Sequence, residues 1–241
     1  MSTWYRLWGS ARLQTQSVQN WLGLWWPEEA IGGKKGGYVI IALQAIADRL
    51  DDSFIGSLDY SLAFDSLVPE LIVAMFQHAG LPRGVCQILH NLWKNQVRYL
   101  ESERVVHPRM QPVSTSFPLG DTWSVVAMVL ALTPAIKDIK QRFPNTVLRT
   151  FIDDRTFASP PASEVCAVRD AWAEWSHFLG LSQNHDKIAM FHATASGRRM
   201  LQAKTGLSLL SVPKYGALNF RAPNKERILR KRRSVSETLT C

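Results

Sequence analysis

The spacing of apolar residues along the chain predicts several helices that each present one apolar face. Apolar side chains recur three or four positions apart, as they do along one side of a helix. This spacing covers three stretches: Val39 to Leu50, with Ile40, Leu43, Ile46 and Leu50 on one stripe, Val85 to Trp93, and Val165 to Leu179, which Gly180 ends. Ser66 is expected to cap a fourth helix, with Pro69 in its first turn and Gly80 at its end. The stretch Trp123 to Ile136 is apolar on almost every side, which predicts a buried helix.

Short apolar runs between these helices predict strands. The runs are Phe54 to Leu58, Thr146 to Phe151, Arg155 to Ala158, and Ile188 to Phe191. Two of them flank Asp153 and Asp154, and a polar pair between two β-prone runs predicts a hairpin. Val97 to Val106 alternates loosely between apolar and polar residues and predicts a second hairpin. The order of elements predicts an α+β fold in which a small antiparallel sheet is backed by helices.

The composition is that of a globular chain. It has 241 residues, 46% of them hydrophobic, which suits one or two domains and excludes a mainly disordered protein. Its three cysteines lie far apart without a CxxC pair, so neither a disulfide framework nor a zinc knuckle is indicated. No apolar stretch reaches the length of about 20 residues that a membrane span needs, and no secretory signal is visible. We therefore expect an intracellular protein without a membrane partner, in either the nucleus or the cytoplasm.

The positive charge is concentrated near the C-terminal end. The net charge is +8, and residues 214–241 hold eight basic and two acidic residues, a net charge of +6. Such a basic tail is either a solvated segment or a surface for the phosphate backbone of a nucleic acid. The charge alone does not separate these two interpretations.

Three carboxylates stand where predicted strands end. Asp59 follows the first strand, and Asp153 and Asp154 follow the second. If these strands are neighbours in one sheet, the carboxylates converge at one edge and repel one another unless cations are present. Oxygen ligands of this kind suit Mg²⁺, and two such ions about 4 Å apart activate an attacking oxygen and stabilise a leaving one in nucleotidyl transfer. The alternative to a metal site is that the Asp153–Asp154 pair forms an ordinary solvated turn.

Four segments around these carboxylates resemble the motifs of reverse transcriptases, most closely those of non-LTR retroelements. Leu58 to Asp65 resembles the first palm motif, and Phe151 to Asp154 resembles the aromatic-x-Asp-Asp motif. Phe117 to Ser124 is similar to the Leu-Pro-Gln-Gly-Asp-Pro-x-Ser loop, and Leu179 to Lys187 to the Gly-Leu-x-x-Asn-x-x-Lys motif. The order and spacing of the segments agree with the family, and the resemblance extends from about residue 5 to residue 220.

The resemblance implies a polymerase palm with partial fingers. Residues 1–50 would be the partial fingers region, 51–213 the palm, and 214–241 a basic tail or the start of a thumb. The implied activity is that of an RNA-directed DNA polymerase, which joins a dNTP to the 3′-hydroxyl of a DNA primer on an RNA template. The implied cofactor is a pair of Mg²⁺ ions, with Mn²⁺ as a substitute.

The resemblance also assigns roles to the residues that match the motifs. Asp59 and Asp153 would bind the two metal ions, with Asp154 as the second carboxylate of the hairpin. Lys187 would donate a proton to the leaving pyrophosphate, although an unpaired surface lysine is an equal alternative.

Two further residues would contact the nucleotide. Phe64 would lie against the sugar and exclude a 2′-hydroxyl, while the alternative is a core phenylalanine beside Ala63. Gly120 would let the backbone approach template and nucleotide closely, while the alternative is a turn before a helix.

The sequence also departs from the family pattern. Leu119 replaces a glutamine that contacts the nucleotide, and the chain begins near the middle of the fingers region. Lys34 and Lys35 lie between two glycine pairs without P-loop spacing, so we interpret that loop first as a flexible connector. Two alternatives to an active polymerase therefore stay open. One is a catalytically inactive fragment that binds nucleic acid through its basic tail, and the other is an unrelated two-metal nuclease.

Overall fold

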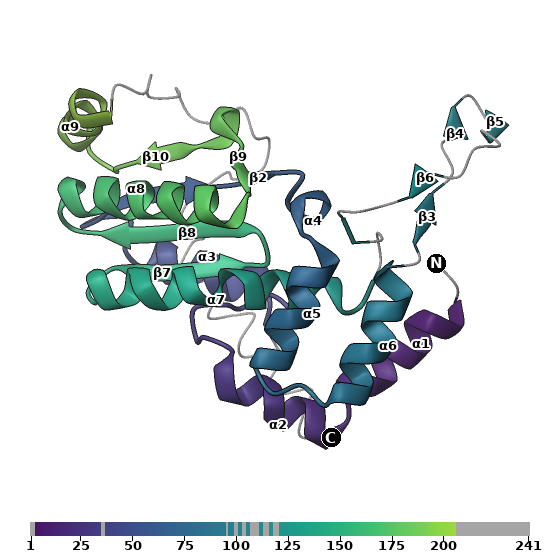
Figure 1. Ribbon diagram of the computed structural model, residues 1–241. Coiled ribbons are helices and arrows are strands. Elements are labelled where there is room, and N and C mark those ends of the chain that lie inside the picture. The colour runs from purple at the N-terminus through teal and green to yellow at the C-terminus, as the bar shows by residue number, and fades with distance from the viewer. Residues whose placement is uncertain are drawn as a thin grey trace, which may run out of the picture. The chain divides into compact units, whose positions relative to one another are not determined.

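A four-stranded antiparallel sheet organises the computed structural model, which describes residues 3–34, 37–94, 96–98, 101–102, 105–106, 111–112, 116–117 and 121–205 (Figure 1). The strands are β1 (Phe54–Leu58), β7 (Val147–Phe151), β8 (Asp154–Ser159) and β10 (Ala189–Phe191). Their order is β10-β1-β8-β7, and each neighbouring pair is antiparallel. The α+β class expected from the sequence is confirmed.

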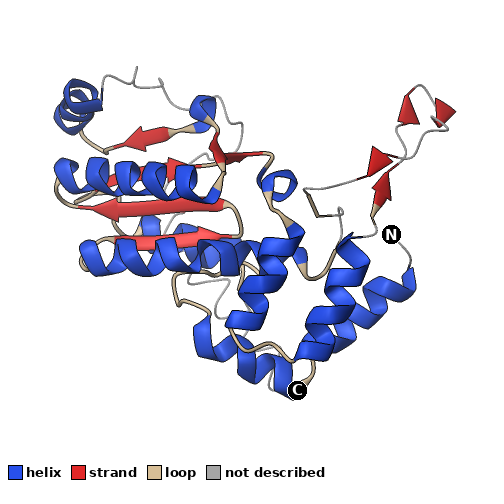
Figure 2. Ribbon diagram, in the orientation of Figure 1, coloured by secondary structure: helices blue, strands red, loops and turns tan. Residues whose placement is uncertain are grey.

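Helices cover both faces of the sheet (Figure 2). α7 (Ser124–Arg142) and α8 (Ala162–Leu179) lie on one face, and α3 (Val39–Ala47) lies on the other. Because side chains alternate along a strand, Leu58 and Phe157 enter the large core beneath α7 and α8. Ile55 and Ala158 point the other way and pack with Ile46 of α3.

The remaining elements are shorter. The helices are α1 (Thr3–Leu13), α2 (Gln16–Trp25), α4 (Ala63–Ser66), α5 (Pro69–His78), α6 (Arg83–Lys94), α9 (Ala195–Thr205) and the 3₁₀ turn η1 (His185–Lys187). Two-residue strands pair β2 (Tyr60–Ser61) with β9 (Ser182–Gln183), β3 (Val97–Arg98) with β6 (Gln111–Pro112), and β4 (Glu101–Ser102) with β5 (Val105–Val106). No helix in the described part of the chain is long and apolar enough to cross a membrane.

The helix faces differ from the expected ones in two places. In α3, Ile46 is buried as expected, but Ile40 is 63% exposed, because only part of this short helix lies over the sheet. Ser66 does not cap α5. It ends α4 instead, where its hydroxyl donates a hydrogen bond to the carbonyl of Leu62, and Val68 precedes α5.

The hairpin expected over Val97 to Val106 is correct only in part. β4 pairs with β5 inside this stretch, but β3 pairs with β6, which lies beyond it. The loose alternation marked extended backbone without fixing the partner, since register depends on residues further along the chain.

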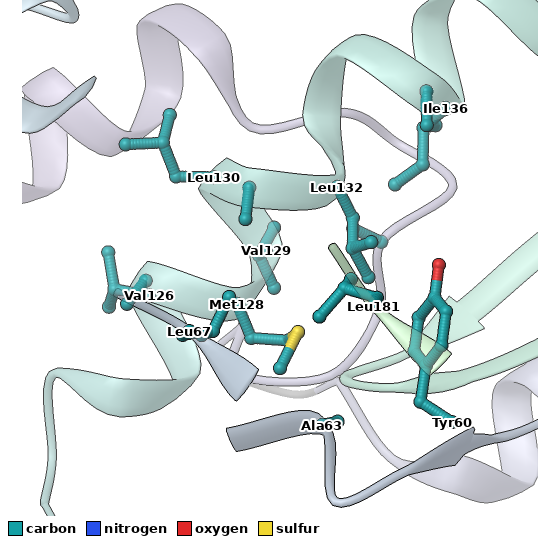
Figure 3. Packing of buried hydrophobic residues seen from close by; sticks show 14 of the residues in the cluster. Tyr60, Ala63, Leu67, Val126, Met128, Val129, Leu130, Leu132, Ile136 and Leu181 are labelled. Atoms are coloured by element: carbon teal, nitrogen blue, oxygen red, sulfur yellow. The ribbon is translucent and has the colours of Figure 1, made fainter. Parts of the chain in front are cut away.

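The buried helix α7 supports the segments near the ends of β1 and α8. Its residues from Val126 to Thr133 are all buried, as its continuous apolar run predicted. Figure 3 shows Met128 and Leu132 among the side chains that cluster with Tyr60 and Leu181. The core thus continues up to the residues that flank the sheet edge carrying Asp59.

A buried carboxyl group joins three helices. Asp121 is 3% exposed, and its side chain accepts hydrogen bonds from the Tyr5 hydroxyl of α1 (2.9 Å), the Trp93 indole N–H of α6 (2.7 Å) and the backbone N–H of Trp123 (2.9 Å). Its backbone carbonyl accepts a further bond from the hydroxyl of Ser124, the first residue of α7. One side chain therefore ties α1 and α6 to the start of α7.

Replacing Asp121 with asparagine is expected to lower the free energy of unfolding by about 1–3 kcal/mol. All three partners of the carboxyl are donors, so the amide group of asparagine would face at least one N–H or O–H with a second donor. Chemical denaturation followed by tryptophan fluorescence measures the loss. The exposed control Asp51→Asn should change stability by less than about 0.5 kcal/mol.

The difference in stability between wild type and Asp121→Asn should also depend on pH. Burial raises the pKa of Asp121 above its ordinary value, although its three hydrogen bonds oppose the shift. A carboxyl with a raised folded pKa stabilises the fold below the unfolded pKa of about 3.9 and loses that contribution as the pH rises through the folded pKa. The stability gap between wild type and Asp121→Asn should therefore be larger near pH 4 than near pH 7. A gap that widens toward neutral pH would contradict this expectation.

Candidate functional site

The register of the sheet brings three carboxylate residues to one end. β1 ends at Leu58, which pairs with Arg155, so Asp59 leaves the sheet beside the start of β8. Phe151 pairs with Asp154 and closes the β7–β8 hairpin over Ile152 and Asp153. Ile152 adopts a left-handed conformation with a φ of 62°, as this tight turn requires. The structure thus brings Asp59, Asp153 and Asp154 together, as expected for neighbouring strands.

The electrostatics of this edge show that the carboxylates affect one another. Burial is the largest cause that raises the pKa of Asp153 and of Asp154 above the ordinary value. Repulsion from Asp59 raises the pKa of both further, and Asp153 also raises that of Asp154. Positive charge on Arg155 and Lys187 acts in the opposite direction. An excess of negative charge at this edge favours binding of a cation.

Lys187 reaches the same edge from the segment that follows α8. Its ammonium Nζ lies 2.5 Å from Oδ2 of Asp59, and the two form an ion pair. The lysine side chain is 46% exposed and the aspartate side chain 14% exposed. The sequence predicted a role for Lys187 at the site but did not predict its ion pair with Asp59.

The local backbone structure explains why Lys187 lies beside Asp59. Gly180 ends α8 with a φ of 68°, a conformation that glycine adopts without strain. The chain then forms β9, whose Gln183 pairs with Tyr60 of β2, and the N–H of Asn184 donates to the carbonyl of Asp59. The turn η1 follows and carries Lys187. Backbone contacts to the Asp59 segment therefore fix the start of the lysine side chain.

Arg155 follows Asp154, and its positive charge acts on the carboxylates, although sequence reasoning assigned it no role of its own. It is fully buried, and its guanidinium carbon lies 3.4 Å from the centroid of the Tyr60 ring and 5.3 Å from that of Trp172. None of its guanidinium nitrogens has a hydrogen-bond acceptor within the described ranges. The cation is held by aromatic faces and by the nearby carboxylates. Its position directly after Asp154 was the available signal.

Of the two residues expected to contact the nucleotide, Phe64 lies within the described residues and Gly120 does not. Phe64 is partly buried in α4, packs against the large core, and its carbonyl accepts a hydrogen bond from the N–H of Phe117. The preceding Leu62 is 74% exposed and has a φ of 51°, which turns the chain sharply after β2. Gly120 and Leu119 lie outside the described residues.

A segment of the first fifty residues also borders the carboxylate turn. Ile31 donates its N–H to the carbonyl of Thr150 on the outer edge of β7, and Thr150 donates to the carbonyl of Glu29. A Cβ on Gly32 would lie 2.6 Å from the backbone nitrogen of Ile152, so only glycine fits there. Lys34 donates from Nζ to the carbonyl of Pro27 (2.8 Å) rather than to a carboxylate of the site. Lys35 lies outside the described residues.

The donor chemistry of the site fits a divalent cation. Asp59, Asp153 and Asp154 supply only oxygen atoms, which Mg²⁺ and Mn²⁺ bind readily. Within the described part of the chain, however, no three acidic, histidine or cysteine side chains are arranged to hold a metal ion as they stand. The residues therefore fit a metal in kind and in location, and Asp59 is engaged by Lys187 instead.

Comparisons with known proteins find similarity in structure but not in sequence. No protein-family model matches this sequence, and no curated protein does. Solved structures of telomerase are similar in fold. Apo telomerase from Candida tropicalis, truncated from its C-terminal domain, matches with a TM-score of 0.57 and 11% identity over 78% of this chain and 41% of that one.

Telomerase from Candida albicans, in complex with a TWJ fragment of telomeric RNA, matches with a TM-score of 0.53 and 12% identity over 79% of this chain and 35% of that one. The C. tropicalis enzyme with the same kind of RNA fragment matches at 0.53 and 12%, over 80% of this chain and 33% of that one. This chain thus spans less than half the length of these telomerase chains. The described residues share an α+β fold with the matching part of these telomerase chains.

Proposed function

We propose that this chain is the palm of an RNA-directed DNA polymerase of the non-LTR retroelement type. The observation that carries the proposal is that Asp59 and the Asp153–Asp154 pair lie at neighbouring ends of the paired strands β1, β8 and β7, in a fold similar to part of telomerase. In this proposal residues 1–50 are a partial fingers region, 51–213 the palm, and 214–241 a basic tail or the start of a thumb.

The proposed substrates are a dNTP, a DNA primer and an RNA template. Two of the similar telomerase structures are complexes with telomeric RNA fragments, which supports an RNA ligand for this fold. Transfer joins the primer 3′-hydroxyl oxygen to the α-phosphate of the dNTP, and pyrophosphate leaves.

Asp59, Asp153 and Asp154 are the residues that would hold two divalent cations. Such cations stabilise the negative charge of attacking and leaving oxygens in phosphoryl transfer. Burial and mutual repulsion of the carboxylates make cation binding favourable, because a bound cation relieves the repulsion.

Two other side chains act on the substrate in this proposal. Lys187 starts from a turn tied to the Asp59 backbone, within reach of the carboxylates, and donates a proton to the leaving pyrophosphate. Phe64 lies after the sharp turn at Leu62 and blocks the space that a 2′-hydroxyl would need.

Asp153→Asn is expected to abolish primer extension. The substitution removes one negative oxygen ligand while keeping the size of the side chain, and we expect a loss of about 1,000-fold or more, or about 4 kcal/mol of transition-state stabilisation. Extension of oligo(dT) on poly(rA) with dTTP and Mg²⁺ measures the rate. The exposed Asp170→Asn variant is the matched control and should extend like wild type. An unchanged rate in Asp153→Asn would refute the mechanism.

Phe64→Ala is expected to relax the choice of sugar. Removal of the ring opens space for a 2′-hydroxyl, so the preference for dTTP over UTP should fall by about 10- to 100-fold. Phe64→Leu keeps most of the volume and should keep most of the preference, which separates bulk from general damage to the core. The ratio of kcat/KM values for the two nucleotides is the measurement. Equal ratios in all three proteins would make Phe64 a core residue without this role.

The second candidate function is a catalytically silent protein that binds nucleic acid. The observation that favours it is that Asp59 is paired with Lys187, while the described carboxylates do not form a metal-binding group as they stand. In that case the folded wild-type protein would not extend a primer.

Removal of residues 221–241 is expected to weaken binding of single-stranded RNA strongly if this second function holds. The segment holds seven basic residues, and each phosphate contact adds to the salt dependence of binding. Fluorescence anisotropy at several salt concentrations measures both affinity and slope. Binding that ignores both salt and the truncation would exclude this candidate.

A further inference from the structure

The carboxylate edge already contains a cation that belongs to the protein. The Lys187 ammonium lies 2.5 Å from one oxygen of Asp59, at hydrogen-bond distance. It also acts on Asp153 and Asp154, since its charge lowers the pKa of both carboxyl groups. Lys187 thus performs part of the charge compensation that a divalent cation would supply.

Among the described residues, Arg155 and Lys187 both place positive charge near these carboxylates, and they differ in exposure to solvent. Arg155 is fully buried between β8 and α8, with its guanidinium against the Tyr60 ring. It cannot leave without disrupting the core. Lys187 is 46% exposed and reaches Asp59 through a flexible four-carbon stem. Of these two cations, only Lys187 can exchange with an ion from solution.

The backbone beneath Lys187 need not move for such an exchange. The N–H of Asn184 donates to the carbonyl of Asp59 (3.0 Å), and the N–H of Lys187 donates to the carbonyl of Asn184 (3.1 Å). Pairing of β9 with β2 holds the same segment. The ammonium can therefore rotate away from Asp59 while its Cα stays beside the site.

We propose that Lys187 and a divalent cation are alternative partners of the Asp59 carboxylate, so that binding of the cation releases the lysine. The inference rests on the proposed function and deepens it. When a cation takes Asp59, the released ammonium stays near the carboxylates, where it would be available to protonate the leaving pyrophosphate. Binding of the cation to Asp59 would then make the Lys187 ammonium available as a proton donor in the same step.

Direct binding of Mn²⁺ to the full chain tests the exchange without any need for turnover. Free Mn²⁺ is measured by electron paramagnetic resonance with wild type, Lys187→Met and the exposed control Lys137→Met. Lys187→Met should bind Mn²⁺ about tenfold more tightly than wild type, which corresponds to about 1.4 kcal/mol, because no ammonium competes for Asp59. The control should bind like wild type.

Lysine labelling separates direct exchange from a long-range effect of charge. The protein is treated with an amine-acetylating reagent with and without Mn²⁺, and mass spectrometry reports each lysine. Labelling of Lys187 should rise severalfold when Mn²⁺ is added, while Lys137 and Lys204 stay constant. In Asp59→Asn, Lys187 should be labelled readily without Mn²⁺ and respond little to it.

The outcomes distinguish this inference from the function on which it rests. Equal Mn²⁺ affinity in wild type and Lys187→Met, with constant labelling of Lys187, would overturn the exchange and leave the metal site intact. Failure of both proteins to bind Mn²⁺, with circular dichroism showing that they are folded, would overturn the metal site and the exchange together. Tighter binding without increased labelling would reduce the lysine to a distant charge and also refute the exchange.

Discussion

The antiparallel pairing of β1 with β8 is the constraint on which the candidate site depends. It sets Leu58 opposite Arg155, and this register alone places Asp59 beside the turn that holds Asp153. A slip of one residue would turn Leu58 out of the core and move Asp59 away from its neighbours. The large core beneath α7 and α8 resists that slip, since Leu58 and Phe157 are both buried there. Packing of the core thus determines where Asp59 lies relative to the turn that holds Asp153.

Periodicity predicted much of this arrangement, because its information is local. The continuous apolar run of α7, the runs that became β1 and β7, and the glycine that ends α8 were all visible in the sequence. The nearness of Asp59 to Asp153 followed from assuming that their strands are neighbours. Contacts between distant polar residues were not predictable in the same way. The Asp121 bonds to Tyr5 and Trp93 join residues 116 and 28 positions apart, and no spacing rule signals them.

Positive charge near the site is of two kinds. Arg155 follows Asp154 directly, and Tyr60 follows Asp59, so the two stacked side chains join the backbones of both carboxylate segments. This contact lies under the sheet edge, where water does not reach Arg155. The Lys187 ammonium lies nearer the surface. Arg155 is buried and Lys187 is partly exposed, and together they offset part of the negative charge of the carboxylates.

The short contact between residues 29–31 and β7 has a further consequence for the behaviour of the chain in solution. β7 is the last strand of its sheet, and the outer edge of such a strand offers unpaired backbone groups to any extended peptide. Glu29 and Ile31 engage both backbone groups of Thr150 on that edge. The segment that borders the carboxylate turn therefore also blocks strand pairing at the Thr150 position of this edge, through the same hydrogen bonds that brace the turn.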